Sequence, residues 1–359
     1  MTRIIPAMDD DEAREREAIL ARLARRTSAS GMFAAPCLPS LFEHYWAQVV
    51  QLFEAIERPL TGDQLTQFRG ALQRIIDRGF QTSPYAQFIL NYSPAGDDGS
   101  QIQCDFSLAM PTLEQEYERW LKNDAASAPN ELFGKIPDAK VIDLATRLKA
   151  SAEAGASSPL RVLDVGAGGG RNALALARLG LEVDALEPVA GLANALMGEV
   201  ARRGVAVNVT MGDVLQTGTV IAEGRYPLIV LSEVATHFSH EQLARVLPKL
   251  ARGLTDDGTL LLNAFVSRDG YRPSRVAVEV AQTVWSTFFS RPELAALAGR
   301  VGLRLVQEEL CLEYEAARQP AGEWPPTPWY PFWARGHNLF DRAAGPAPIT
   351  LYWLEYRRS

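Results

Sequence analysis

The chain contains few cysteines. Cys37, Cys104 and Cys311 are the three in 359 residues, and they lie far apart without any CxxC pair. A disulfide framework or a zinc site needs clustered cysteines at defined spacing, so this pattern argues against both. We therefore expect a reducing, cytoplasmic setting and no bound metal.

Long apolar runs and an excess of positive charge are also missing. No apolar run approaches the roughly 18 residues of a membrane span, and the charged first 20 residues do not resemble a secretory signal. Lys and Arg number 36 against 43 Asp and Glu, which gives a net charge of −7. Because a basic field attracts nucleic acid and anionic lipid, we expect neither nucleic acid nor a membrane as partner. The oligomeric state is left open.

The length predicts about two domains, at roughly 150 residues per domain. Residues 1–30 are a charged N-terminal arm. Residues 31–150 are expected to form a mainly helical cap or substrate domain, because apolar residues recur every four positions from Leu41 to Phe53 and further helical stretches follow. Alternation over 102–108 predicts one strand in it. The remainder, 151–359, is expected to be the second domain.

Short apolar runs alternate with helical stretches in this second half. The predicted strands are 161–165, 182–186, 206–210, 228–231 and 259–265, followed by two late strands at 303–314 and 349–356. Helices are expected between the early strands. This β-α-β order predicts an α/β fold with a parallel, doubly wound sheet.

The stretch RVLDVGAGGGRN, residues 161–172, joins a strand to a helix through three glycines. Gly166, Gly168 and Gly170 allow a sharp turn and the close approach of a ligand to the backbone. The helix that follows offers unpaired N–H groups beside that ligand. Arg171 stands where the dinucleotide fingerprint GxGxxG has its third glycine, so the spacing disfavours an NAD-binding loop.

Carboxylates stand at the ends of three consecutive predicted strands. Asp164 ends the first, Glu187 the second, and Asp213 follows the third. Glu187 can accept hydrogen bonds from two ribose hydroxyls, and Asp213, with the Val214 N–H, can bind an adenine. The strand ends meet in one crevice, where open α/β sheets bind ligands. The alternative is an ordinary α/β domain with a tight turn and surface acids.

This ordered set of motifs resembles the class I S-adenosylmethionine-dependent methyltransferases of the small-molecule type, over about residues 160–356. The resemblance implies a seven-stranded, mostly parallel Rossmann-like sheet with its last strand antiparallel. It implies S-adenosyl-L-methionine as cofactor and S-adenosyl-L-homocysteine as product. It also implies cofactor-binding positions along the strand ends: Asp164, Gly166, Ala167, Gly168, Gly170, Arg171, Asn172, Glu187, Pro188, Asp213, Val214, Ser232, Glu233 and Val234.

Three candidate catalytic residues lie near the expected sulfonium. Glu233 and His237 occur in LSEVATHFSHEQ after the fourth strand, and Tyr271 follows the fifth. His237 can act as a general base near neutral pH; alternatively it packs against or caps the next helix. The segment lacks the Asn/Asp–Pro–Pro–aromatic signature of enzymes that methylate adenine N6 or glutamine, which argues against those acceptors.

An aromatic insertion, residues 316–347, separates the two late strands. Such a long connection in a compact domain is usually functional. It can form a lid over the acceptor, or its rings can seal the junction with the N-terminal domain. The substrate-binding candidates in this insertion are Trp324, Trp329, Tyr330, Trp333 and His337.

These features predict methyl transfer to N, O or S of a small-molecule metabolite by in-line displacement. An alternative keeps the cofactor but cleaves it internally and releases methylthioadenosine, as the azetidine-2-carboxylate synthases do on a similar fold. A second alternative is a non-catalytic ligand-binding module. The acidic charge disfavours a protein- or RNA-directed enzyme.

Overall fold

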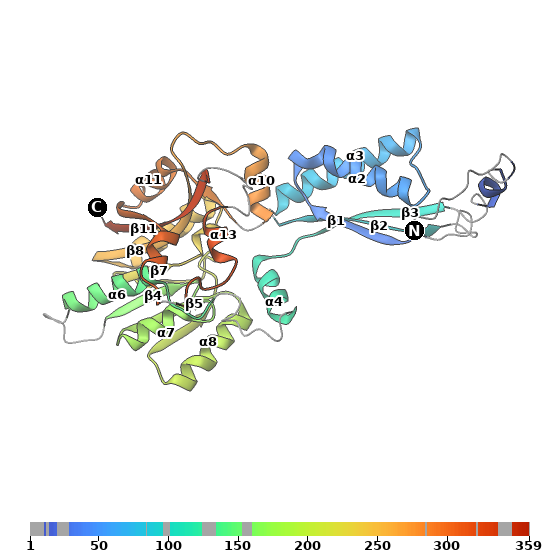
Figure 1. The fold of residues 1–359 in the computed structure, drawn as a ribbon. Helices are drawn as coiled ribbons and strands as arrows, with labels where there is room; N and C mark the ends of the chain where they lie inside the picture. Colours follow the sequence, from blue (N-terminus) through green and yellow to red (C-terminus); the bar gives the residue numbers. More distant parts are fainter. Residues whose placement is uncertain are drawn as a thin grey trace, which may run out of the picture. The chain divides into compact units, whose positions relative to one another are not determined.

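The computed structural model describes residues 11, 14–19, 29–83, 85–95, 101–123, 134–152, 160–283, 286–320, 322–336 and 347–358. The chain divides into a first unit, residues 1–111, and a second unit, residues 112–359 (Figure 1). This boundary differs from the expected one after residue 150. Helices α4 (Leu113–Asn123) and α6 (Ala139–Ala152) contact α8 and α7 of the second unit, which places 112–152 with it.

The first unit is an antiparallel sheet with two helices. Its strands are β1 (Gly31–Pro36), β2 (Gln87–Ala95) and β3 (Gln101–Ala109), in the order β1-β2-β3. A short 3₁₀ helix, η1 (Pro39–Leu41), leads into α2 (Phe42–Ala55), and α3 (Gly62–Thr82) follows. The apolar face of α2 is buried at Tyr45, Val49 and Phe53, as the four-residue spacing predicts.

The helices of this unit were expected, but its three-stranded sheet is larger than the single predicted strand at 102–108. Two of the three strands escape prediction because their patterns are weak. β1 reads GMFAAP and ends in Pro36, which an edge strand tolerates because one side of an edge strand needs no ladder hydrogen bonds. β2 alternates buried and half-buried positions for four residues and then ends in SPA.

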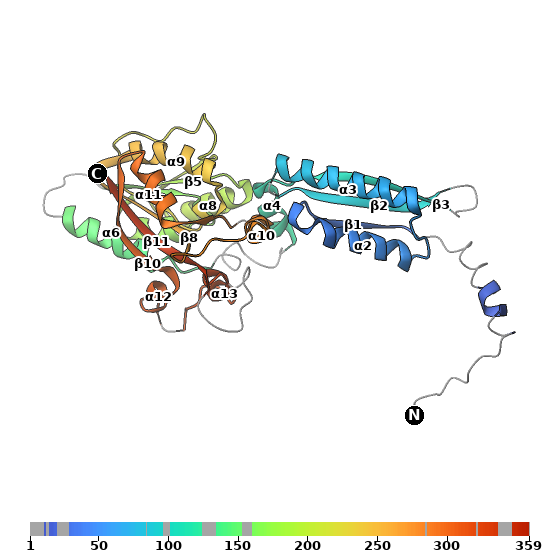
Figure 2. The same cartoon turned by 90° about the horizontal axis from the view of Figure 1, so that it is seen from above.

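The second unit is built on a mixed sheet. Its early strands are β4 (Arg161–Val165), β5 (Glu182–Glu187), β6 (Val207–Met211), β7 (Tyr226–Leu231) and β8 (Leu254–Ser267). The late strands are β10 (Leu303–Leu310) and β11 (Ile349–Arg358). The order is β10-β11-β8-β7-β4-β5-β6, and β11 runs antiparallel to both neighbours, as expected for the last strand. Figure 2 shows β10 and β11 side by side.

The strand count differs from the expected seven. A two-residue strand, β9 (Phe288–Phe289), pairs with β8 and makes eight. Two residues are too few to carry a periodic signal, so the sequence pattern does not predict it. The strand expected at 303–314 ends at Leu310, because α12 (Cys311–Ala316) begins there.

Helices cover both faces of this sheet. Buried residues of α6, α7 (Arg171–Arg178) and α8 (Ala190–Arg203) share one core cluster with Val162, Val183 and Val230. Buried residues of α9 (His240–Gly253) and α11 (Arg291–Gly299) share the other with alternate strand residues such as Leu163 and Ile229. Figure 1 shows α6, α7 and α8 together on one side. A further helix, α10 (Arg275–Thr283), follows β8. No helix in these described ranges is long and apolar enough to cross a bilayer.

The strand order places a topological switch at β4. β4 pairs in parallel with β5 on one side and with β7 on the other, so the crossover helices leave it toward opposite faces. Ligands of open α/β sheets bind at the carboxyl ends of the strands at such a point. The loops after β4, β5 and β7 are therefore the place to look for a site.

One buried carboxylate ties the late part of the second unit to its early part. Glu315, on α12, accepts hydrogen bonds from the backbone N–H groups of Ala139 (2.6 Å) and Lys140 (3.2 Å) at the start of α6. It also accepts one from Nε1 of Trp353 on β11 (2.9 Å). A carboxylate at a helix N-terminus satisfies donors that have no intrahelical partner.

We expect Glu315→Ala to lower the free energy of unfolding of the second unit by about 3 kcal/mol, because it leaves several buried donors without an acceptor. Urea denaturation followed by tryptophan fluorescence measures this, since all tryptophans except Trp46 lie in residues 112–359. The matched control is Glu313→Ala on the exposed side of α12, which should change stability by less than about 0.5 kcal/mol. Equal effects of both substitutions would contradict the role given to Glu315.

Candidate functional site

The glycine loop joins β4 to α7 at the switch point. Gly166 has φ +71°, and a side chain there would overlap the Val234 side chain. Gly170 is the N-cap of α7 with φ +88°, and a side chain there would overlap Leu196. Both positions need glycine for conformation and for close packing, as the sequence pattern predicts. Gly168 differs: a Cβ built on it meets no atom within 4 Å, so the loop borders open space there.

Glu187 ends β5 and points at this loop. Its side chain is 3% exposed. Its Oε2 accepts a hydrogen bond from the Gly168 N–H at 2.7 Å, and its Oε1 accepts one from the Val189 N–H at 2.8 Å, across the intervening Pro188. Burial raises the pKa of Glu187, while these two hydrogen bonds oppose the rise. The structure thus brings together Glu187 and the glycine loop.

Asp213 and Val214 follow β6, the neighbour of β5. The Gly212 N–H bonds to the Glu187 carbonyl at 3.0 Å, which sets this turn beside the end of β5. The Asp213 carboxylate is half-buried and accepts a hydrogen bond from the Leu215 N–H at 2.8 Å. Val214 is buried. Asp213 therefore lies at the predicted strand end, and its carboxylate orders the turn that follows.

Asp164 occupies the interior of the sheet, inside β4. It is 2% exposed, and its Oδ2 has no hydrogen-bond partner within the described part of the chain. Burial, reinforced by the charge of Asp138, raises the pKa of Asp164 to about 7. A buried carboxyl oxygen without a partner is costly unless a ligand satisfies it.

Arg171 lies at the centre of a buried ionic cluster. Its guanidinium contacts the Asp138 carboxylate at 2.9 Å and the Glu233 carboxylate at 2.7 Å, and it donates to the Ser232 hydroxyl at 3.3 Å. Burial lowers the pKa of Arg171, but the charges of Asp138 and Glu233 more than offset this and hold that pKa above its ordinary value. The guanidinium is therefore a permanent cation shared by two carboxylates.

Asn172 completes this cluster. It donates from Nδ2 to Asp138 Oδ2 at 2.8 Å and accepts from the Asp138 N–H at 2.9 Å. Asp138 also accepts a hydrogen bond from the Ser232 hydroxyl at 2.5 Å. One carboxylate before α6 thus ties the start of α7 to the end of β7. Buried charges are stable when paired and hydrogen-bonded in this way.

The backbone is strained where β7 ends. Glu233 has φ +60°, in the left-handed region that non-glycine residues rarely adopt. Asn263, a fully buried residue of β8, accepts a hydrogen bond from the Glu233 N–H at 2.6 Å and stabilises this conformation. Burial raises the pKa of Glu233, and the charge of Arg171 opposes that rise. Strain of this kind is concentrated at functional sites.

His237 lies in a short 3₁₀ helix, η2 (Ala235–His237), just beyond Glu233 and Val234. Its Nε2 is 3.2 Å from the hydroxyl of Tyr117 on α4. Ser239, not His237, caps α9, through a capping box with Gln242. The capping alternative for His237 is therefore excluded, and the imidazole contacts a phenol instead.

Helix α4 contacts both flanks of the crevice. Tyr117 contacts His237 on the β7 side. Glu118 accepts a hydrogen bond from the Gly191 N–H at 2.7 Å, in the first turn of α8 on the β5 side. The two loops that flank the glycine loop are thus linked by one helix.

The aromatic candidates pack mainly against one another and the core. Trp324 lies 5.5 Å from Tyr330, and Trp333 lies 5.1 Å from Phe265 of β8, between ring centroids. Tyr330 opens α13 (Tyr330–Ala334) and is buried, whereas Trp329 is exposed.

Two further candidates remain. Tyr271 is half-buried against the same core as Trp324 and Trp333. His337 lies outside the described residues.

Among the members of the site that the sequence-based candidates do not include are Asp138 and Asn263. Asp138 precedes α6 and resembles an ordinary helix start, so nothing local reveals its bonds to Arg171. Asn263 carried a signal: it is the one amide within the apolar run TLLLNAFV of β8. A lone amide in a fully buried strand needs a partner, and here that partner is the Glu233 backbone.

Comparisons with known proteins agree with this geometry. The family model described as a methyltransferase domain matches residues 117–308. No curated protein sequence matches the chain.

Three solved structures are similar at low identity. A putative sarcosine dimethylglycine methyltransferase from Galdieria sulphuraria is 16% identical, with a TM-score of 0.47, covering 67% of this chain and 97% of its own. The [4+2]-cyclase SpnF is 17% identical, with a TM-score of 0.45, covering 69% and 96%. Geranyl diphosphate C-methyltransferase from Streptomyces coelicolor A3(2) is 17% identical, with a TM-score of 0.43, covering 69% and 99%.

Asp164 predicts how the stability of the second unit depends on pH. Its pKa is about 7 in the folded chain, against about 3.9 for an unfolded aspartate, so the native state holds a proton that the unfolded state releases. Between pH 5 and 7 this group should lower the free energy of unfolding by up to about 1.4 kcal/mol per pH unit as pH rises. Asp164→Asn should flatten that slope, measured by urea denaturation across this pH range. A slope for Asp164→Asn that is parallel to the wild-type slope would show that Asp164 does not titrate there.

Proposed function

The chain belongs to the methyltransferase-domain family, and from this premise we propose that it transfers a methyl group from S-adenosyl-L-methionine to a nitrogen, oxygen or sulfur atom of a small molecule. The observation that carries the proposal is the pair of hydrogen bonds that hold the Glu187 carboxylate against the glycine loop. In this place the carboxylate can accept the ribose hydroxyls of an adenosyl group that lies over Gly168.

The residues present fit the cofactor. Asp164 has a buried carboxyl oxygen without a partner in the described chain, which suits the ammonium group of the methionine moiety. Gly168 borders open space where a side chain would otherwise stand. Both features favour a ligand with a positively charged end and a flat face close to the backbone.

The charge of the crevice also favours a cation. Asp138, Asp164, Glu187 and Glu233 are four carboxyl groups around the glycine loop, and Arg171 is the guanidinium among them. The cofactor carries a sulfonium and an ammonium against one carboxylate. A site with an excess of buried carboxyl groups attracts such a ligand.

His237 is proposed as the general base for acceptors that arrive protonated. The bound cofactor supplies an electrophilic methyl carbon with a good leaving group, so the protein mainly positions the acceptor and excludes water. Tyr117, at 3.2 Å from His237 Nε2, orients the imidazole and is a positioning residue. Glu233, bound to Arg171 and held by Asn263, shapes the loop that carries His237.

Calorimetry with both nucleosides tests the cofactor site. We expect saturable binding of S-adenosylmethionine and S-adenosylhomocysteine, and an affinity at least tenfold lower for Glu187→Ala, which removes both oxygen acceptors. Glu187→Gln keeps one oxygen acceptor, so its affinity for the nucleosides should fall less than that of Glu187→Ala. The matched control, Glu182→Ala at the opposite end of β5, should bind as wild type. Undetectable binding of both nucleosides to the wild-type protein would remove the proposal.

A labelled-methyl assay tests the reaction class. Incubation with the cofactor and a panel of amines, phenols, carboxylates and thioethers should yield a methylated acceptor and S-adenosylhomocysteine. Methylthioadenosine formed from the cofactor alone would instead establish internal cleavage.

Variants of His237 and Tyr117 test the proposed base. His237→Ala should lower the rate for ammonium or phenol acceptors by about 100-fold, yet leave thioether acceptors and S-adenosylhomocysteine affinity nearly unchanged. Tyr117→Phe should lower this rate less than His237→Ala does, and it should alter the pH profile of kcat/KM. His240→Ala, on an exposed neighbour, is the control. Equal rates for His237→Ala and His240→Ala would contradict the role of His237.

A further inference from the structure

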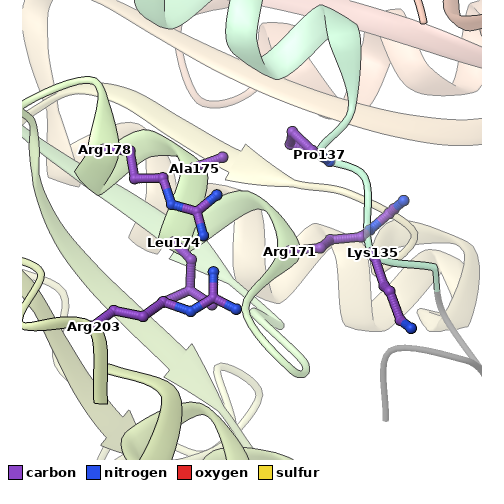
Figure 3. A pocket seen from close by; sticks show the side chains of 7 residues that line it. All are labelled: Lys135, Pro137, Arg171, Leu174, Ala175, Arg178 and Arg203. Carbon is purple, nitrogen blue, oxygen red and sulfur yellow. The ribbon is translucent and has the colours of Figure 1, made fainter. Parts of the chain in front are cut away.

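A cavity of about 120 Å³ in the second unit is lined by residues of the segment before α6, of α7 and of α8. Four of its lining residues are cations: Lys135, Arg171, Arg178 and Arg203. Its walls include the apolar side chain of Leu174, and none of its lining residues is acidic. Figure 3 shows the guanidinium groups of Arg178 and Arg203 near each other beside Leu174.

Helix dipoles account for only part of this grouping. Arg178 and Arg203 stand in the last turns of α7 and α8, where cations are favourable. Arg171, however, stands in the first turn of α7, where a cation is unfavourable, and Lys135 precedes α6. Residues of three segments place cations around the same cavity. Their positions in the helices do not fully explain this arrangement.

The positive charge of the cavity is only partly neutralised. Arg171 is paired with Asp138 and Glu233. Arg203 shares the Glu199 carboxylate with Arg202, at 2.6 and 2.7 Å. Lys135 and Arg178 are exposed and form no ion pair within the described ranges, although the charge of Glu199 also acts on Arg178. Like charges around one cavity repel, so an anion placed between them would stabilise the arrangement.

We propose that this cavity, between α7 and α8, binds a phosphoryl group, either as free phosphate or as part of a phosphorylated small molecule. Planar guanidinium groups bind tetrahedral oxyanions bidentately, and a lysine adds a point charge. The volume suits one compact oxyanion together with ordered water, at about 30 Å³ per water.

The proposed anion site is separate from the glycine loop. Arg178 lies seven residues after Arg171 along α7, a rise of about 10 Å. The phosphoryl group would contact Arg178 and Arg203, whose guanidinium groups lie together in Figure 3, with Lys135 and Arg171 at the border of the cavity. The proposal therefore does not depend on the proposed reaction, and it is tested by binding alone.

Calorimetry with inorganic phosphate at constant ionic strength, in the presence of excess S-adenosylhomocysteine, tests the site. We expect one saturable site in the wild-type protein. The double variant Arg178→Ala/Arg203→Ala should bind phosphate at least tenfold more weakly. Glu199→Gln, which frees Arg203 from its carboxylate, should bind it more tightly. A parallel titration with methyl phosphate distinguishes the source: tighter binding than phosphate indicates a phosphorylated molecule, and weaker binding indicates the free anion.

Arg202→Ala is the matched control, since Arg202 neighbours Arg203, pairs with the same Glu199 and does not line the cavity. It should bind phosphate as the wild-type protein does. Thermal unfolding should show that all variants fold and that phosphate raises the Tm of the wild type but not of the double variant. Three results would overturn the proposal. They are no phosphate binding to the wild type, equal phosphate binding to the double variant, or loss of phosphate binding when S-adenosylhomocysteine is added.

Discussion

The site in the second unit depends on one buried guanidinium. Arg171 holds Asp138, which precedes α6, and Glu233, which follows β7, at the exit of the glycine loop. Without this cation, the Asp138 and Glu233 carboxylates would lose their shared ionic partner, a cost of several kcal/mol. With it, the β7 loop takes its left-handed turn at Glu233, and the segment that bears His237 begins at a fixed place.

The sequence predicts those parts of the site whose chemistry is local. The three glycines and Glu187 stand at strand ends, where spacing alone implies a turn and an acceptor, and the structure brings them together. Local sequence patterns do not predict contacts between residues that lie far apart in the chain. Asp138 lies 94 residues from Ser232, and Tyr117 lies 120 residues from His237. Only the folded chain reveals these pairs.

The fold follows the same division. Strands buried on both faces, such as β7, are continuous apolar runs, and β7 is predicted to within two residues. Strands β1 and β2 of the first unit have proline near their ends and a weak burial pattern, so they escape prediction, whereas β3 is predicted from its alternation. The two residues of β9 form a strand through their pairing with β8, and this long-range contact is not predicted by a local sequence pattern.

The surplus of carboxyl groups around the glycine loop has a consequence for turnover. Transfer of the methyl group converts a sulfonium into a neutral thioether, so the nucleoside leaves the reaction with one positive charge fewer. At the proposed cofactor site, the charges of Asp138, Glu187 and Glu233 would then attract the spent molecule less than the fresh one. Charge would thereby bias the exchange of the spent nucleoside for a fresh one at that site.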